Sequence, residues 1–148
     1  MAVKFDQHVD IDAPPDKVWS IITNPSTWPL WLSDITGNPN LASLTEGATF
    51  QWSGNGEDGT GSVVSVNTKA YSFQIVTQSG GRPVTHTFDI DRSGGFLGIG
   101  GNDSRLKYTM EYDPPGGFIS DFVAGGNPKD AIKVKNTLQK VRKLAEGN

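Results

Sequence analysis

Hydrophobic and polar residues alternate at the start of the chain. Between Val3 and Asp12, Gln7 and the apolar side chains occupy every second position, while His8 and charged side chains fill the positions between them. A period of two with one apolar face is typical of a half-buried β-strand. The pattern therefore predicts a strand over residues 3–12, with His8 on its solvent-facing side.

Helix signals follow this strand. Pro14, Pro15 and Asp16 mark a helix start, where proline loses no hydrogen bond and a carboxylate complements the helix dipole. The residue before Pro25 is pushed out of the α region, which predicts the end of this helix. A second short helix or turn is expected over residues 28–32.

Alternating segments separated by short spacers make up most of the remaining chain. The expected strands are 48–53, 60–67, 71–79, 84–90 and 106–112, with a weak, irregular candidate at 34–41. Within the second of these, Val64 and Val66 are expected on one face. Parallel crossovers need a dozen or more residues, so the short spacers favour antiparallel neighbours.

A long helix is expected at the end of the chain. Asn127 and Pro128 mark its start, and Gly147 stands just past its end. Its apolar positions repeat at intervals of three and four: Ala131, Val134, Leu138, Val141 and Ala145. Such a stripe has to pack against another element, and the apolar sheet faces are the only partner large enough.

These elements predict an α+β fold. It consists of a curved antiparallel sheet of about seven strands wrapped around the long C-terminal helix, with two short helices after the first strand. No internal repeat or linker divides the sequence. A single domain over residues 1–148 is therefore expected.

Composition narrows the classes of function. The 148 residues include 18 Gly and 9 Pro, an excess that fits many turns, and no Cys. Without cysteine there is no disulfide, thiolate zinc site, iron–sulfur ligation or cysteine nucleophile. No apolar run reaches the ~20 residues that span a bilayer, and no signal peptide opens the chain, so we expect a cytoplasmic protein without stable membrane association.

Charge is distributed unevenly around the net value of −3. Residues 129–148 carry six basic and two acidic side chains, whereas the preceding residues carry seven basic and fourteen acidic ones. A cationic end suggests a nucleic acid or a membrane as partner, but a solvated helix face is the interpretation we favour. The predicted sheet has no basic face with exposed aromatics, so we expect no nucleic-acid partner.

Two short motifs resemble the opening of a known superfamily. Residues 11–19 follow the pattern I-x-A-P-x-x-x-V-W, and residues 28–31 read W-P-L-W. Together with a closing L-x-x-V-x-x-L-x-E at 138–146, they resemble the START-like (SRPBCC) proteins, and among these the small bacterial polyketide cyclase/dehydrase and lipid transport group. The sequence departs from many relatives at 102–105, where Gly-Thr is replaced, and in the length of its glycine-rich stretch.

The resemblance implies a helix-grip fold with a cavity between the sheet and the C-terminal helix, but no shared catalytic constellation. Mainly aromatic side chains on the inward faces are the candidate ligand-binding residues: Trp28, Trp31, Phe50, Trp52, Phe73, His86, Phe88, Tyr108, Met110, Phe118 and Phe122. We expect both of these tryptophans outside the strands, and the last two phenylalanines, near an entrance. For any one of these residues, ordinary core packing is the alternative.

Among the candidates, His86 is the residue whose side chain could both donate a hydrogen bond to a ligand and act as an acid or base. It lies between Val84 and Phe88 on an apolar face, where an unpaired imidazole is costly. One hypothesis makes it a donor to a ligand carbonyl or, together with Tyr108, an acid–base pair. The structural alternative pairs it inside the core with Tyr108, Tyr112 or a backbone carbonyl.

We therefore expect a protein that binds a small hydrophobic, lipid-like or aromatic molecule. One alternative is a polyketide-type cyclase/dehydratase that uses His86 and Tyr108, although no carboxylate or arginine stands on a predicted inward face. The other is an interaction module that binds a partner protein without a ligand. The ligand and the oligomeric state do not follow from the sequence.

Neither a nucleotide nor a metal site is expected. The glycine-rich stretch 93–102 lacks the spacing of phosphate-binding loops, so it is expected as a hairpin loop. Its apolar tip is expected to pack on the sheet edge; the alternatives are that it gates the cavity or touches a membrane or a partner. The two histidines, His8 and His86, stand 78 positions apart on different strand faces and form no metal-binding pattern. We expect no cofactor.

Overall fold

The computed structural model describes residues 3–54, 56–80, 82–92, 103–113 and 128–147. Its elements in chain order are β1 (Val3–Ile11), α1 (Pro15–Ile22), the 3-10 helix η1 (Pro25–Thr27), α2 (Trp28–Trp31), β2 (Thr49–Gly54), β3 (Glu57–Asn67), β4 (Ser72–Ser79), β5 (Arg82–Arg92), β6 (Ser104–Tyr112) and α3 (Pro128–Ala145).

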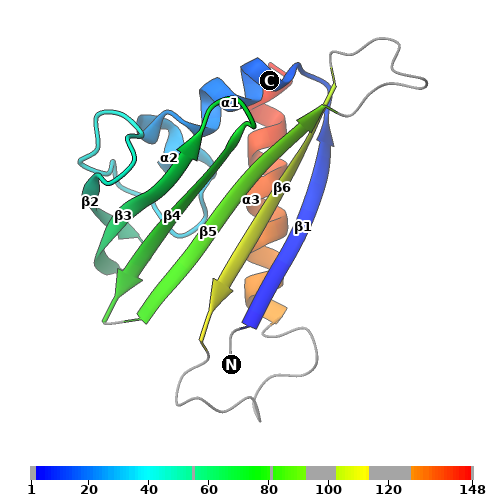
Figure 1. Ribbon diagram of the computed structural model, residues 1–148. Helices are drawn as coiled ribbons and strands as arrows, with labels where there is room; N and C mark the ends of the chain where they lie inside the picture. The colour runs from blue at the N-terminus through cyan, green and yellow to red at the C-terminus, as the bar shows by residue number, and fades with distance from the viewer. Residues whose placement is uncertain (1–2, 55, 81, 93–102, 114–127, 148) are drawn as a thin grey trace.

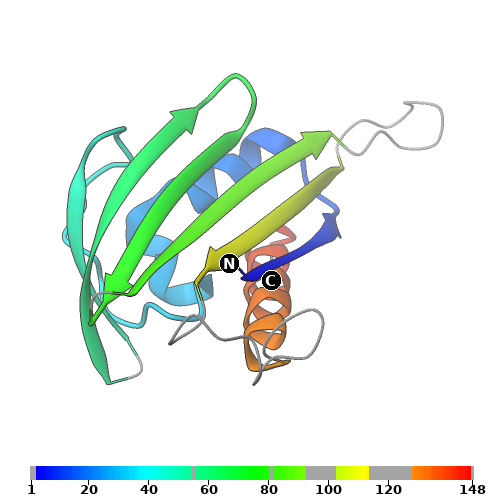
Figure 2. The ribbon, with the colours of Figure 1, turned by 60° about the horizontal axis from the view of Figure 1, so that its bottom comes forward.

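The strands form one antiparallel sheet in the order β1-β6-β5-β4-β3-β2 (Figures 1 and 2). Each strand from β2 to β6 therefore pairs with its neighbour in the chain, as the short spacers predicted. The first strand closes the arrangement by pairing with β6 along its whole length. This places β1 and the last strand of the meander side by side, over the C-terminal helix.

The sheet has six strands in the described residues, a slight difference from the expected number of about seven. The weak candidate at 34–41 forms no strand but runs along the outer edge of β2. There the Thr36 amide donates to the Ser53 carbonyl at 2.9 Å, and the Gln51 amide donates to Asn40 Oδ1 at 2.6 Å. A side chain thus satisfies an edge amide that a seventh strand would have bonded, and the segment covers the exposed edge of β2.

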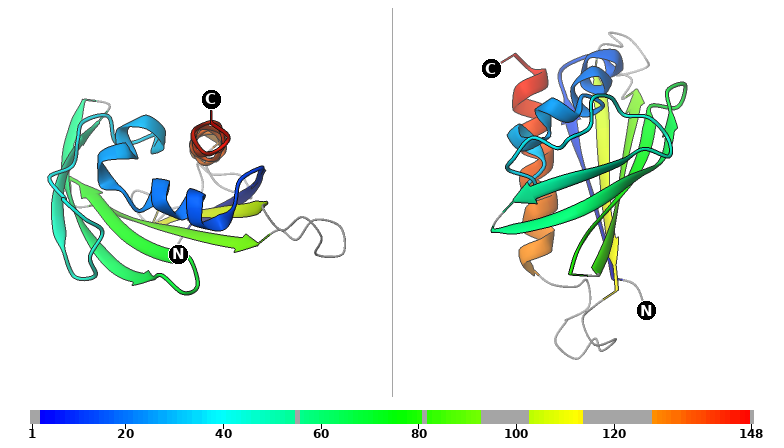
Figure 3. Two further views of the ribbon diagram at one scale, coloured as in Figure 1. Left: turned by 90° about the horizontal axis from the view of Figure 1, so that it is seen from above. Right: turned by 90° about the vertical axis from the view of Figure 1, so that its left-hand side faces the viewer.

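All three α-helices lie on the concave face of the curved sheet (Figure 3). The helix α3 packs mainly against β1, and it also contacts α1, α2 and β6. Its expected stripe is confirmed, since Val134, Leu138, Val141 and Ala145 are buried and Ala131 packs against the core. None of the helices in the described ranges is long and apolar enough to cross a membrane.

An irregularity in β3 changes which of its valines faces the core. The register against β4 shifts between Val63 and Ser65, which is the mark of a β-bulge. Val63 is buried as a result, whereas Val64 is 45% exposed and Val66 packs partly against the core. The expectation that Val64 and Val66 share one face was therefore wrong, because a bulge breaks the period of two.

Two glycines of β3 make room for the aromatic rings of β2. A Cβ atom on Gly61 would stand 2.3 Å from Cζ of Phe50, and one on Gly59 would stand 2.6 Å from the ring of Trp52. The Trp52 ring lies across β3, where its Nε1–H donates to the Thr60 carbonyl at 2.9 Å. This close approach fixes the wall of the pocket described below.

Candidate functional site

The structure places nine of the eleven candidate ligand-binding residues in the core. Each of the nine is at most 8% exposed: Trp28, Trp31, Phe50, Trp52, Phe73, His86, Phe88, Tyr108 and Met110. Phe118 and Phe122 lie outside the described residues, as does the glycine-rich stretch 93–102. The geometry of the site is therefore built from the nine buried residues and their neighbours.

Most of these aromatic rings contact one another. Phe88 stacks on Tyr108 with ring centroids 4.3 Å apart and on Phe73 at 5.0 Å, and Trp31 meets it edge-on at 5.4 Å. This layer crosses β4, β5 and β6 and fills the centre of the concave face. The rings thus pack as a core at this point rather than as the walls of a wide cavity.

The expectation that Trp28 and Trp31 lie near an entrance is wrong, because both are buried inside this core. Trp28 packs edge-on against Phe50, and its Nε1–H donates to the Ile22 carbonyl at 2.9 Å. The Nε1–H of Trp31 donates to Thr27 Oγ1, also at 2.9 Å. Because the preceding turn supplies both acceptors, the two rings are buried with their polar atoms satisfied.

His86 belongs to a chain of three buried polar side chains that spans β4, β5 and β6. Its Nε2 lies 2.9 Å from Thr77 Oγ1, and its Nδ1 lies 2.6 Å from the Tyr108 hydroxyl. Both partners are diagonal neighbours across the ladder, since Thr77 pairs with Val84 and Tyr108 pairs with Phe88. The alternative in which Tyr108 pairs with His86 inside the core is therefore what the structure shows.

Burial determines the charge states of the His86 and Tyr108 side chains. It lowers the pKa of His86 to about 4; the Asp34 carboxylate opposes this shift and the Lys133 ammonium adds to it. Burial also raises the pKa of the Tyr108 hydroxyl well above its usual value, with smaller contributions from Asp34 and Asp130. At pH 7 the imidazole is consequently neutral and the phenol keeps its proton.

The row of hydrogen-bonded side chains formed by Tyr108, His86 and Thr77 ends beside a pocket. Thr77 lines a recess of about 220 Å³ between the edge of the sheet and α3; its other lining residues are Asp34, Trp52, Gly54, Glu57, Gln78, Ser79, Arg82, Val84 and Lys133. Behind it lies a void lined by His86, Thr77, Trp52, Asp34, Leu32 and Ile35, which is too small to admit a water molecule. Thr77 thus stands between the open recess and the buried imidazole.

Charged side chains form the rim of the recess. Lys133 Nζ lies 3.0 Å from Asp34 Oδ1 and 3.8 Å from Asp130 Oδ1, and the Tyr112 hydroxyl donates to Asp130 Oδ2. Partial burial lowers the pKa of Lys133, but its hydrogen bond to Asp34 and the nearby carboxylates outweigh this and raise it overall. Lys133 is thus an ammonium at pH 7, which suits ion pairing and not nucleophilic attack.

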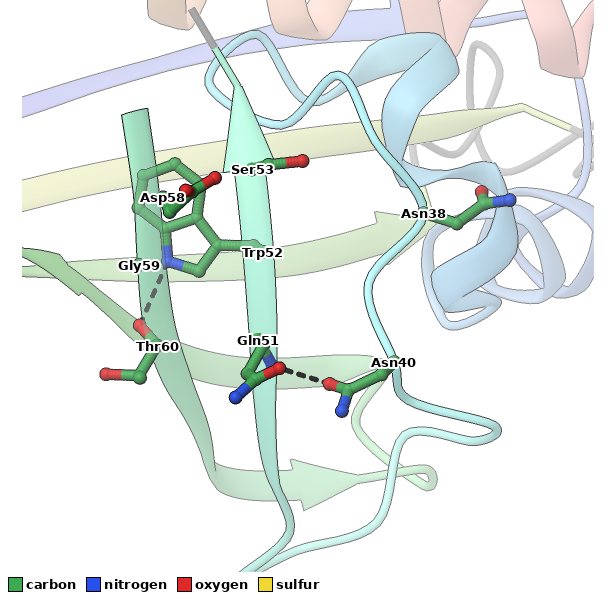
Figure 4. A pocket seen from close by; sticks show the side chains of 8 residues that line it. All are labelled: Asn38, Asn40, Gln51, Trp52, Ser53, Asp58, Gly59 and Thr60. Atoms are coloured by element: carbon green, nitrogen blue, oxygen red, sulfur yellow. Dashed lines mark hydrogen bonds between the residues drawn. The ribbon is translucent and has the colours of Figure 1, made fainter. Parts of the chain in front are cut away.

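A second, wider groove of about 600 Å³ lies on the other side of Trp52 (Figure 4). Polar side chains from the 38–40 segment, β2 and β3 line it: Asn38, Asn40, Gln51, Ser53, Asp58 and Thr60, together with Gly59. Within the described ranges, no group of three or more His, Asp or Glu side chains is placed to hold a metal ion. Trp52 therefore lines both this groove and the recess beside Thr77.

Thr77 is the member of this site that sequence reasoning missed. The signal was present, because Phe73, Ile75 and Thr77 alternate along β4 and all three are buried. A threonine at the end of an apolar face is easily taken for a residue at the solvent boundary. Only the register of β4 against β5 places it beside His86.

Comparison with known proteins agrees with the fold. The family model described as "Polyketide cyclase / dehydrase and lipid transport" matches residues 2–146. No curated protein matches the sequence. The resemblance stated from the two N-terminal motifs is thereby confirmed at the level of the family.

Solved structures share the architecture at low sequence identity. The protein CV1439 from Chromobacterium violaceum superposes with a TM-score of 0.69 at 13% identity, over 99% of each chain. DynU16, a putative protein in the dynemicin biosynthetic locus, gives 0.68 at 17% identity over 97% of this chain and 47% of its own. Norcoclaurine synthase from Thalictrum flavum, in complex with dopamine and hydroxybenzaldehyde, gives 0.66 at 12% identity over 97% of this chain and 86% of its own.

Proposed function

Because the chain belongs to the polyketide cyclase / dehydrase and lipid transport family, we propose that it binds a small hydrophobic molecule in the recess beside Thr77. The observation that carries this proposal is the position of the Thr77–His86–Tyr108 chain. Three polar side chains are buried in an aromatic layer, and the outermost of them lines an open recess. Trp52 and Val84 give the recess an apolar side, and its other lining residues except Gly54 are polar or charged, so the recess suits a small ligand with an apolar part and a polar group.

The size of the recess favours a ligand with a single ring. Its volume of about 220 Å³ exceeds the ~150 Å³ of a protein cavity that binds benzene, and it is below the ~300 Å³ at which sites for drug-sized ligands begin. The norcoclaurine synthase of similar fold was solved with dopamine and hydroxybenzaldehyde, which are molecules of this size. A polycyclic ligand would require the aromatic layer to open.

The charge state of His86 favours binding over acid–base catalysis at this residue. A general acid works best with a pKa near the operating pH, whereas burial lowers that of His86 to about 4. The neutral imidazole still holds its two neighbours in place through hydrogen bonds. We therefore give His86 and Tyr108 the task of orienting Thr77, and Trp52 and Val84 that of contacting the apolar part of the ligand.

Titration with acetophenone, followed by amide chemical shifts, tests the proposal. We expect the largest shifts at residues of the recess, among them Asp34, Trp52, Thr77 and Lys133. Val84→Phe fills the recess and should abolish these shifts. Thr85→Phe adds similar bulk to the next position of β5, which faces the other side of the sheet, and should preserve them. Absence of binding, or shifts that survive Val84→Phe, would refute the proposal.

A further inference from the structure

The direction of the hydrogen bonds in the buried chain can be derived from Tyr108. In the described part of the protein its hydroxyl has one partner, Nδ1 of His86. The phenol keeps its proton at neutral pH, so this proton has to be donated to an acceptor or remain buried and unsatisfied. If Nδ1 carried a proton, two hydrogens would face each other across 2.6 Å or the phenol would donate to nothing. Tyr108 therefore donates to Nδ1.

This choice determines the tautomer of His86. A neutral imidazole carries one N–H, and with Nδ1 acting as acceptor the hydrogen is on Nε2. The nearest group to Nε2 is Thr77 Oγ1 at 2.9 Å, which accepts this hydrogen. The chain thus runs from Tyr108 through His86 to Thr77, with each donor matched to one acceptor.

Thr77 is left with a hydrogen to donate. Its hydroxyl accepts from His86, and its side chain has no other hydrogen-bond partner among the residues that the structure describes. Since Thr77 lines the recess, its O–H is free to turn toward a bound molecule. We infer that Thr77 presents a hydrogen-bond donor to the recess and that the protein selects ligands with an acceptor oxygen, such as an aromatic ketone, aldehyde or ester. This inference rests on the proposed function and specifies its ligand class.

The opposite direction is unfavourable in this environment. It would make Thr77 donate to Nε2 and would leave the Tyr108 hydrogen without an acceptor. The Tyr108 ring is stacked against Phe88 at 4.3 Å and against His86 at 5.8 Å, so the hydroxyl lies within an aromatic layer. A buried donor without an acceptor is among the most costly defects of a core, whereas an outward-pointing threonine hydroxyl is solvated in the empty recess.

The tautomer can be measured without any ligand. In a sample labelled with 15N at histidine, we expect His86 to show Nε2 protonated and Nδ1 bare. The same signals should hold from pH 6 to pH 8, with His8, on the exposed face of β1, as the second labelled histidine of the sample. An Nδ1–H tautomer or a charged imidazolium at pH 7 would overturn the inference, whatever the protein binds.

A matched pair of probes tests the ligand class. Acetophenone and ethylbenzene have similar size and shape, but only the ketone carries an acceptor oxygen. We expect acetophenone to bind about threefold to tenfold more tightly, as one net hydrogen bond implies. Thr77→Val should remove this preference and Thr77→Ser should retain it, and circular dichroism should show both variants folded.

The outcomes separate the two proposals. Equal affinity for the two probes in the wild-type protein, or a preference that survives in Thr77→Val, would overturn the donor role while leaving the recess as a binding site. If neither probe bound, the proposed function would fail and the ligand class with it. If Thr77→Val did not fold, Thr77→Ser and the histidine tautomer would still decide the question.

Discussion

The Tyr108 hydroxyl lies 2.6 Å from Nδ1 of His86, and the two rings are stacked with their centroids 5.8 Å apart. Each residue is 1% exposed, so neither polar group has water as a substitute partner. The pair is therefore a self-satisfied polar contact inside an aromatic layer. Removing one partner leaves the other without a hydrogen bond, so a substitution at either residue should show the contribution of this contact to stability.

Tyr108→Phe should lower the free energy of unfolding by about 1–3 kcal/mol, because Nδ1 of His86 loses its only hydrogen bond among the described residues. Tyr71→Phe is the matched control. Its hydroxyl donates to Asp16 on the surface, where water can replace the lost partner, so the same change should destabilise the protein much less. Urea unfolding measures both, and equal losses would contradict the account of the buried chain.

His86 should make stability depend on pH in a defined window. Its pKa falls from the usual 6.5 in the unfolded chain to about 4 in the folded protein. Between these values the unfolded state binds more protons, so the free energy of unfolding rises with pH across the window and the His86 contribution is constant above it. The pKa difference corresponds to about 3 kcal/mol over the whole window.

Comparison with His86→Gln isolates this contribution from the carboxylates that titrate in the same range. Urea unfolding at pH 7 and pH 4.5 should show the wild-type protein losing about 2–3 kcal/mol more than the variant. Parallel pH profiles for the two proteins would mean that the imidazole is not held neutral by burial.

Gly61→Ala should destabilise the protein, although alanine inside a strand is usually more stabilising than glycine. The added Cβ would stand 2.3 Å from Cζ of Phe50, whose ring is packed against Trp28. Overpacking of this kind costs about 1–3 kcal/mol. Ser65→Ala, at an exposed position of the same strand, should change the melting temperature little by comparison. A Gly61→Ala protein as stable as wild type would show that the Phe50 ring is free to move.

The order of the helices and strands could be predicted from the sequence because each element has a hydrophobic pattern or a proline signal within its own segment. The period of two in β1 and β4, the spacing of Val134, Leu138 and Val141, and the prolines at the helix starts each report on their own segment. The two differences in the sheet arise where a neighbour overrides the local pattern. A bulge exposes Val64, and the side chain of Asn40 caps the β2 edge in place of a strand.

The candidate site was predicted only in part, for a related reason. The apolar face of β5 singled out His86, but its partners depend on the register of three strands. The alternation along β4 indicates that Thr77 is buried, but nothing in its own segment indicates that it bonds to His86. Trp28 and Trp31 were misplaced because nothing in the W-P-L-W motif shows that Ile22 and Thr27 supply acceptors for both indole nitrogens.

The most direct measurement is a crystal structure of the protein soaked with acetophenone. We predict that the ring lies against Trp52 and Val84 in the recess, with the ketone oxygen about 2.7–3.0 Å from Thr77 Oγ1. A molecule bound in the polar groove beside Asn38, a ketone oxygen turned away from Thr77, or an empty recess at saturating acetophenone would contradict it.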